Sequence, residues 1–171
     1  ILGAAGYATC IVGKWQLSGR GDLYPGTHPD ESGFDEWCLW EVDEETGGSR
    51  YWNPTIKANG NLLQDTGGQF GPDIFSEYLL DFISRNKDRP FFLFLAYNGP
   101  YGLGSAMLEP IRNRHKDTYA EAALPSFPRI KPHPWNYHYA DRIGDLRAIR
   151  KYAAEISGID DGVGRVMQTL R

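Results

Sequence analysis

The sequence predicts an α/β fold with a mainly parallel sheet, because two apolar runs of strand length alternate with two helical patterns. The first run, Thr9 to Val12, is short, and the second, Phe91 to Tyr97, is apolar at every position. An unbroken apolar run is typical of a strand covered by helices on both faces, so we expect the second strand to be nearly inaccessible. The chain has 171 residues, of which 41% are hydrophobic, and can bury one sizeable core.

Two helices are expected to pack against this sheet. Gly71-Pro72-Asp73 begins the first, since proline fits the first helical position and an acidic residue stabilises the first turn. We expect this helix to end near Asn86. The second helix has apolar residues at alternating steps of three and four, which form one stripe: Ile149, Tyr152, Ile156, Ile159, Val163, Val166 and Leu170.

The segments between these elements carry weaker signals. Residues 13–71 are rich in Gly, Pro, Asp and aromatic residues and are expected to form a surface excursion. Within them, Asn59-Gly60 between apolar flanks predicts a tight hairpin over residues 55–63. Residues 98–145 are rich in proline and predict a long ordered loop, which is often functional.

Charge and hydropathy exclude some partners. The net charge of −4 argues against nucleic acid, because binding a phosphate backbone requires a basic face. The chain has no apolar run of about 18 residues that would span a bilayer, and no signal peptide at its start. It begins at Ile1 without methionine, so we expect part of a longer protein, cut at both ends, and the compartment stays open.

Cysteine and histidine patterns predict neither a disulfide scaffold nor a metal site. Cys10 lies in an apolar strand and is expected to be a small core residue. His133 and His138 are five residues apart in a proline-broken loop, which is no standard metal spacing. The neighbouring Asp160 and Asp161 point about 100° apart on a helix, so ion pairing or solvation accounts for them better than a shared ion.

The main functional signal lies where the two strands end. Lys14 directly follows the first strand, and Asn98 and Tyr101 follow the second. If the strands are parallel, both loops leave the same carboxyl edge of the sheet, where open α/β folds bind their ligands. A lysine placed there suits an anionic substrate. Two ordinary strand-end turns are the alternative interpretation.

Four blocks of the chain resemble the sulfatase family, the arylsulfatase branch of the alkaline phosphatase superfamily. In chain order they are residues 5–19 with Gly-Lys-Trp, 33–37 with Gly-Phe-Asp, 90–101 with Pro-Phe-Phe-Leu, and 152–165 with Asp-Asp-Gly-Val-Gly. The resemblance implies that residues 1–171 are the central part of an N-terminal catalytic domain, truncated at both ends. It also implies a three-layer α/β/α, alkaline-phosphatase-like architecture.

The family resemblance carries cofactors and residue roles with it. Sulfatases use a formylglycine, made from the cysteine of Cys-x-Pro-x-Arg, beside a calcium ion. Neither cysteine here has those followers, so the resemblance implies that the nucleophile and calcium ligands lie outside this chain. Lys14 matches the sulfate-contacting lysine, whereas Gln16 and Tyr101 replace two family histidines. An amide cannot act as a base at neutral pH, and tyrosine is a weaker acid than histidine.

The expected function is therefore sulfate ester hydrolysis by the full-length protein, on sulfated sugars or aryl sulfates, with this chain alone inactive. The candidate catalytic residues are Lys14, Gln16 and Tyr101, and the candidate substrate-binding residues are Lys14, Trp15, Asn98 and Tyr101. The expected partners are a sulfate ester and the rest of the sulfatase domain, and a secreted or periplasmic location is compatible. A phosphate or phosphonate monoester hydrolase and a catalytically silent sulfoglycan-binding homologue stay open as alternatives.

Overall fold

The computed structural model describes residues 1–18, 26–100, 112–127 and 144–171, which fall into two compact units. The first unit comprises residues 1–98 and 162–171, and the second comprises residues 99–161. The first holds a five-stranded sheet in the order β4-β3-β2-β1-β5. Its strands are β1 (Ala8–Lys14), β2 (Glu36–Trp40), β3 (Ile56–Ala58), β4 (Asn61–Leu62) and β5 (Phe91–Ala96). Together with the helices below, this sheet confirms the predicted α/β class.

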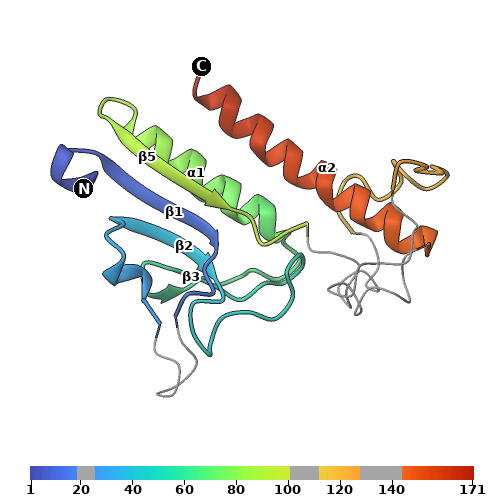
Figure 1. Ribbon diagram of the computed structural model, residues 1–171, viewed down its shortest axis with the longest axis horizontal. Coiled ribbons are helices and arrows are strands. Elements are labelled where there is room, and N and C mark those ends of the chain that lie inside the picture. Colours follow the sequence, from blue (N-terminus) through green and yellow to red (C-terminus); the bar gives the residue numbers. More distant parts are fainter. Residues whose placement is uncertain (19–25, 101–111, 128–143) are drawn as a thin grey trace. The chain divides into compact units, whose positions relative to one another are not determined.

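The sheet is mixed, with its parallel part around β1. β1 pairs in parallel with β2 on one side and with β5 on the other (Figure 1). β3 and β4 add an antiparallel hairpin beyond β2, and its turn places Asn59 and Gly60 at positive φ. This hairpin confirms the prediction from the Asn-Gly pair. The parallel strands are the ones that place the site residues.

β5 is less buried than its apolar sequence predicted. Among the described strands it pairs only with β1, and Phe92 and Phe94 are 39% and 50% exposed. The expectation of a nearly inaccessible strand was therefore wrong for this chain. Phe91, Leu93 and Leu95 pack against the helix-covered core, whereas the alternate residues lie on the other face. β1, which lies between β2 and β5, is the central strand of the parallel part, and its residues from Ala8 to Gly13 are all buried.

β2 corrects a second expectation. Residues 13–71 were expected to be a surface excursion, yet they contain a strand in which Trp37, Cys38, Leu39 and Trp40 are buried. The strand is short and apolar on both faces, so it shows no alternation that would distinguish it from the aromatic-rich loops around it. Cys10 is also buried, as predicted for a small core residue.

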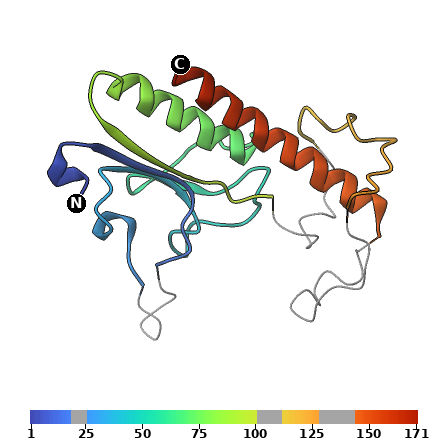
Figure 2. The ribbon, with the colours of Figure 1, turned by 45° about the horizontal axis from the view of Figure 1, so that its top comes forward.

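Helix α1 (Gly71–Asn86) begins and ends where the sequence predicted. Its residues Phe75, Leu79 and Phe82 are buried in one cluster with Cys10 and Val12 of β1. α1 therefore covers one face of the sheet, as Figures 1 and 2 show. On the opposite face, a second cluster contains Ile11, Trp15, Trp37, Leu39 and Val42.

Helix α2 (Leu146–Thr169) follows the predicted apolar stripe, although Ile156 and Val163 are exposed. In the first unit, its Gly162 is buried against the hydrogen-bonded hydroxyls of Ser76 and Tyr97, whose oxygens are 2.7 Å apart. A Cβ at this position would overlap both oxygens. No helix in the described ranges is long and apolar enough to cross a membrane.

In the second unit, residues 112–127 are joined to the first half of α2 by polar contacts. The Asn113 amide donates to the Ala154 carbonyl at 2.9 Å and to the buried Glu155 carboxylate at 3.2 Å. Asp161 pairs with both Arg114 and His115, which confirms the ion-pair interpretation. Burial acts to raise the pKa of Asp161, but the hydrogen bonds from His115 and Arg114 outweigh it and lower that pKa.

Candidate functional site

Three parallel strands bring the candidate residues to one edge of the sheet. Lys14 ends β1 and lies in register with Trp40, the last residue of β2. Gly13 lies in register with Ala96 at the end of β5, and Asn98 follows two residues later. The parallel pairing that the sequence argument required is therefore present. Lys14, Gln16 and Asn98 leave the sheet at its carboxyl edge, where α/β folds bind ligands.

Gly13 allows β1 and β5 to approach closely at this edge. Its φ of +118° lies in a region that residues with side chains rarely adopt. A Cβ built on Gly13 would overlap the carbonyl oxygen of Ala96 and lie 3.1 Å from the Tyr97 nitrogen. The glycine before Lys14 is thus a steric requirement of the site.

Beyond Lys14, the backbone stays tied to β2 through strained residues. The Trp15 N–H donates to the Trp40 carbonyl and the Gln16 N–H to the Glu41 carbonyl, each at 3.0 Å. Gln16 and Glu41 both have positive φ, 57° and 58°. Non-glycine residues held in this region cost of order 1–3 kcal/mol each and cluster at functional sites. The backbone hydrogen bonds between the two strand ends hold both residues in this conformation.

The Lys14 ammonium is partly buried beside an indole and a carboxylate. Its Nζ lies 5.9 Å from the centroid of the Trp40 ring and 3.9 Å from Glu41 Oε2. The Lys14 and Glu41 side chains are 23% and 19% exposed. Water screens a charge less in such a place than on an open surface, and the Glu41 carboxylate offsets part of the positive charge that an anion at the strand ends would meet.

Arg50 and Asn98 form a second part of the same edge. The Arg50 Cζ lies 4.6 Å from the centroid of the Trp40 ring, and its Nη1 donates to the Asn98 carbonyl at 3.0 Å. In return, Asn98 Nδ2 donates to the Arg50 carbonyl at 2.9 Å. Asn98 is only 2% exposed. Trp40 therefore contacts a lysine from β1 and an arginine that holds the loop after β5.

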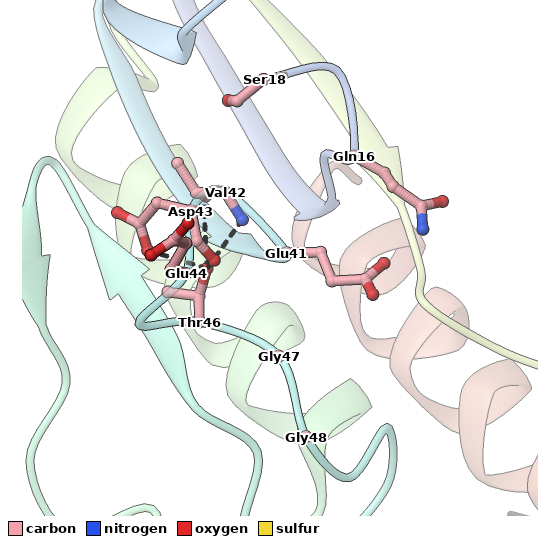
Figure 3. Close-up of a pocket in the computed structure, with 9 residues that line it drawn as sticks. All are labelled: Gln16, Ser18, Glu41, Val42, Asp43, Glu44, Thr46, Gly47 and Gly48. Carbon is pink, nitrogen blue, oxygen red and sulfur yellow. Dashed lines mark hydrogen bonds between the residues drawn. The ribbon is translucent and has the colours of Figure 1, made fainter. Parts of the chain in front are cut away.

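A cavity of about 420 Å³ lies between the turn after β1 and the loop after β2, with Gln16 and Glu41 on its wall. In Figure 3 the Gln16 and Glu41 side chains extend to the same side, away from Asp43 and Thr46. Lys57 of β3 pairs with both Asp43 and Glu45, and these contacts anchor the acidic loop. Glu41, Asp43 and Glu44 are on the wall of the cavity, and residues 43–45 are exposed.

Trp15 and Tyr101 are the two predicted site residues that are not seen at the carboxyl edge of the sheet. Trp15 is 7% exposed in the apolar cluster on the face opposite α1, and its indole N–H donates to the Thr27 carbonyl at 3.0 Å. This placement accounts for Trp15 by packing, and its role in substrate binding stays a prediction. Tyr101 lies outside the described residues, so its predicted place in the site also stays a prediction.

The described residues do not fit the cofactors that the resemblance implies. Within the described ranges, no group of three or more His, Cys, Asp or Glu residues could hold a metal ion. Burial raises the pKa of the Cys10 thiol to about 12, and burial also raises the pKa of Cys38. Neither buried thiol is therefore poised as a nucleophile or a metal ligand. No calcium or formylglycine step can be built on these residues.

A protein-family model described as Sulfatase matches residues 1–171, and the chain belongs to the sulfatase family. Members of this family generally depend on calcium and formylglycine. The fold agrees: a crystal structure of a sulfatase named yidJ from Bacteroides fragilis aligns with a TM-score of 0.66 at 23% identity. The alignment covers 99% of this chain and 38% of that protein. At this identity the likeness concerns the fold alone.

Two curated relatives carry names of sugar sulfatases. N-acetylgalactosamine-6-sulfatase of Sus scrofa is 28% identical over 189 residues, covering 100% of this chain and 28% of the relative. N-acetylglucosamine-6-O-sulfatase of Bacteroides thetaiotaomicron is 26% identical over 102 residues, covering 59% of this chain and 16% of the relative. The chain thus spans less than a third of the length of these two relatives.

Sequence reasoning missed Trp40, Glu41 and Arg50. Their signal was present in part, because Trp40-Glu41 stands at the end of a short apolar run, as Gly13-Lys14 does at the end of β1. If β2 is taken as a parallel strand, Trp40 falls beside Lys14 at the carboxyl edge of the sheet. Arg50 follows an irregular loop, and no local pattern indicates that it reaches Trp40.

Proposed function

We propose that the protein to which this chain belongs hydrolyses sulfate esters, and that Lys14 binds the sulfate group. The observation that carries the proposal is the partly buried Lys14 ammonium at the carboxyl edge of a sheet whose chain matches the sulfatase family throughout. A fixed cation beside the sulfuryl oxygens stabilises the negative charge that develops on them in the transition state.

For the substrate we propose a sugar sulfated at its 6-hydroxyl. Two relatives are named as 6-sulfatases of N-acetylgalactosamine and N-acetylglucosamine, which supports an N-acetylhexosamine. The cavity between the turn after β1 and the loop after β2 offers the Gln16 amide, the Ser18 hydroxyl and several carboxylates. Such groups exchange hydrogen bonds with sugar hydroxyls. The nucleophile and metal would come from parts of the protein outside this chain.

The substrate proposal is tested on the full-length protein. We expect it to release sulfate from the 6-sulfates of N-acetylglucosamine and N-acetylgalactosamine faster than it releases phosphate from the matching 6-phosphates, with ion chromatography as the measurement. Faster phosphate release would favour the phosphomonoesterase alternative. Binding of the sulfated sugars in calorimetry, without release of sulfate, would favour the silent sulfoglycan-binding homologue.

Gln16 lies two residues after β1, at a position where the family resemblance implies a histidine, and this difference supports the silent homologue. Gln16 is exposed and lines the cavity, so it can contact a ligand, but its amide cannot carry a proton between groups. If hydrolysis proceeds through a sulfated intermediate, its breakdown is the step that lacks a local base. Turnover would then stall after the first sulfuryl transfer.

Gln16→His in the full-length enzyme should therefore raise the steady-state rate by about 100-fold and the initial burst much less. The measurement is pre-steady-state release of product from an aryl sulfate. Gln16→Asn is the control, because it keeps an amide and asparagine tolerates the positive φ of this position. Equal rates for Gln16→His and wild type would show that another base already serves. If Gln16→His is slower than wild type in both the burst and the steady state, the amide instead makes a contact with the substrate.

A further inference from the structure

Arg50 is the residue of the strand-end site that no sequence signal indicated. We infer that Arg50 is a positioning residue: it fixes Asn98 and Trp40 relative to one another and so sets the geometry around Lys14. The inference rests on the proposed function for its meaning in catalysis. Its structural part, the coupling of the loops after β2 and β5, stands on contacts within the first unit alone.

Arg50 and Asn98 hold each other by a reciprocal pair of hydrogen bonds. The guanidinium of Arg50 donates to the backbone carbonyl of Asn98, and the side-chain amide of Asn98 donates to the backbone carbonyl of Arg50. Each residue thus contributes its side chain and its main chain. The two positions are 48 residues apart, so this pair closes a long loop at the site.

The backbone around Arg50 is packed as tightly as its side chain. A Cβ at Gly71 would come within 2.8 Å of the Arg50 carbonyl oxygen, and the Gly71 N–H donates to the neighbouring Tyr51 carbonyl at 2.7 Å. Tyr51 itself is 1% exposed. The start of α1 therefore holds the main chain at Arg50, while the contacts with Trp40 and the Asn98 carbonyl hold its guanidinium.

The chemistry of these contacts requires an arginine. A planar guanidinium can lie against the Trp40 ring and at the same time direct an N–H to the Asn98 carbonyl, whereas a lysine ammonium offers a point charge on a flexible stem. Trp40 is itself fixed, because its indole N–H donates to the Gly47 carbonyl at 2.7 Å. Lys14 lies against this same ring, so the position of the ring links Arg50 to Lys14.

The side-chain amide oxygen of Asn98 is one of the atoms that Arg50 holds in place. Its Oδ1 is buried, and among the described residues nothing donates a hydrogen bond to it. A buried acceptor without a donor costs about 1–3 kcal/mol, so its retention calls for an explanation. Because this oxygen is buried, it belongs to the packed support behind the strand ends and not to the surface that a ligand would meet. Arg50 keeps the Asn98 main chain, and with it this acceptor, in one place.

Arg50→Lys and Asn98→Ala in the full-length protein test the inference through two measurements. Amide hydrogen exchange in the segment of β5 and Asn98 should become faster in both variants, because each loses one of the reciprocal bonds. The kcat for sulfate ester hydrolysis should fall about 10- to 100-fold in Arg50→Lys, since small displacements of a positioned group are costly, while KM changes much less. The exchange measurement requires no activity.

Arg85→Lys is the matched control. Arg85 also lies near an aromatic ring, with its Cζ 5.9 Å from the Phe82 centroid, and it forms two hydrogen bonds of 2.8 and 2.9 Å with Glu36. Glu36 begins β2, so this arginine lies at the opposite edge of the sheet. We expect Arg85→Lys to lower the melting temperature without changing kcat or exchange at Asn98.

The outcomes separate the two proposals. If amide exchange in β5 and at position 98 is unchanged in both Arg50→Lys and Asn98→Ala, the positioning role is overturned. In an active enzyme, equal kcat values for Arg50→Lys and Arg85→Lys would overturn it as well. Absence of sulfate release by the wild-type protein, together with faster exchange in the variants, would instead overturn the proposed function and leave the coupling of the two loops established.

Discussion

Gly13→Ala should destabilise the first unit by about 4 kcal/mol, enough to unfold a marginally stable protein. Two costs add at this position. Alanine is strained at a φ of +118°, and its Cβ would overlap the Ala96 carbonyl oxygen, which belongs to the backbone of the neighbouring strand. Because β1 is central, a shift that relieves the overlap would also disturb β5. Urea unfolding monitored by tryptophan fluorescence measures the effect.

Two other glycines separate these costs. Gly33 has a positive φ of 82°, but a Cβ at this position would meet no atom within 4 Å, so Gly33→Ala should cost only about 1 kcal/mol through backbone strain. Gly164 lies within α2 in open space, and Gly164→Ala should be neutral or stabilising by up to about 1 kcal/mol. A Gly13→Ala protein as stable as Gly33→Ala would contradict the close approach of β1 and β5.

The sequence predicted elements whose signal is local. α1 begins at Gly71-Pro72 because proline fits the first turn, and the Asn59-Gly60 turn closes the hairpin of β3 and β4 because both residues accept positive φ. The burial of β5 was mispredicted, since an apolar run shows that a strand can be covered but not what covers it. Which strand is central depends on pairing, which no local pattern contains.

The residues of the candidate site show the same contrast between local signals and contacts that are distant in the chain. Lys14 was predicted because it directly follows a buried strand in a motif that resembles the sulfatase family. Arg50 was missed because its place depends on contacts with Trp40 and Asn98, which are 10 and 48 residues away in the chain. Trp15 was predicted to bind substrate as part of the Gly-Lys-Trp motif; it lies in the apolar cluster, and its role in substrate binding stays a prediction.

Lys14→Met should lower kcat/KM for sulfate ester hydrolysis by about 100- to 1,000-fold in the full-length protein, which corresponds to a loss of about 3–4 kcal/mol of transition-state stabilisation. Methionine keeps an unbranched apolar stem against Trp40 but removes the charge that we propose binds the sulfate group. The melting temperature should also fall, because the variant leaves the largely buried Glu41 carboxylate with one cation fewer beside it. Steady-state kinetics and thermal unfolding measure the two effects.

Lys87→Met is the control for loss of a lysine charge, since Lys87 is exposed at the end of α1, far along the chain from the strand-end residues. Lys14→Arg should recover part of the activity lost in Lys14→Met, because a cation remains at the end of β1 although its shape differs. If Lys14→Met and Lys87→Met show the same kcat/KM, Lys14 does not bind the sulfate group. A loss in Lys14→Met that Lys14→Arg does not relieve at all would mean that the length and shape of lysine, rather than its charge, are what the substrate requires.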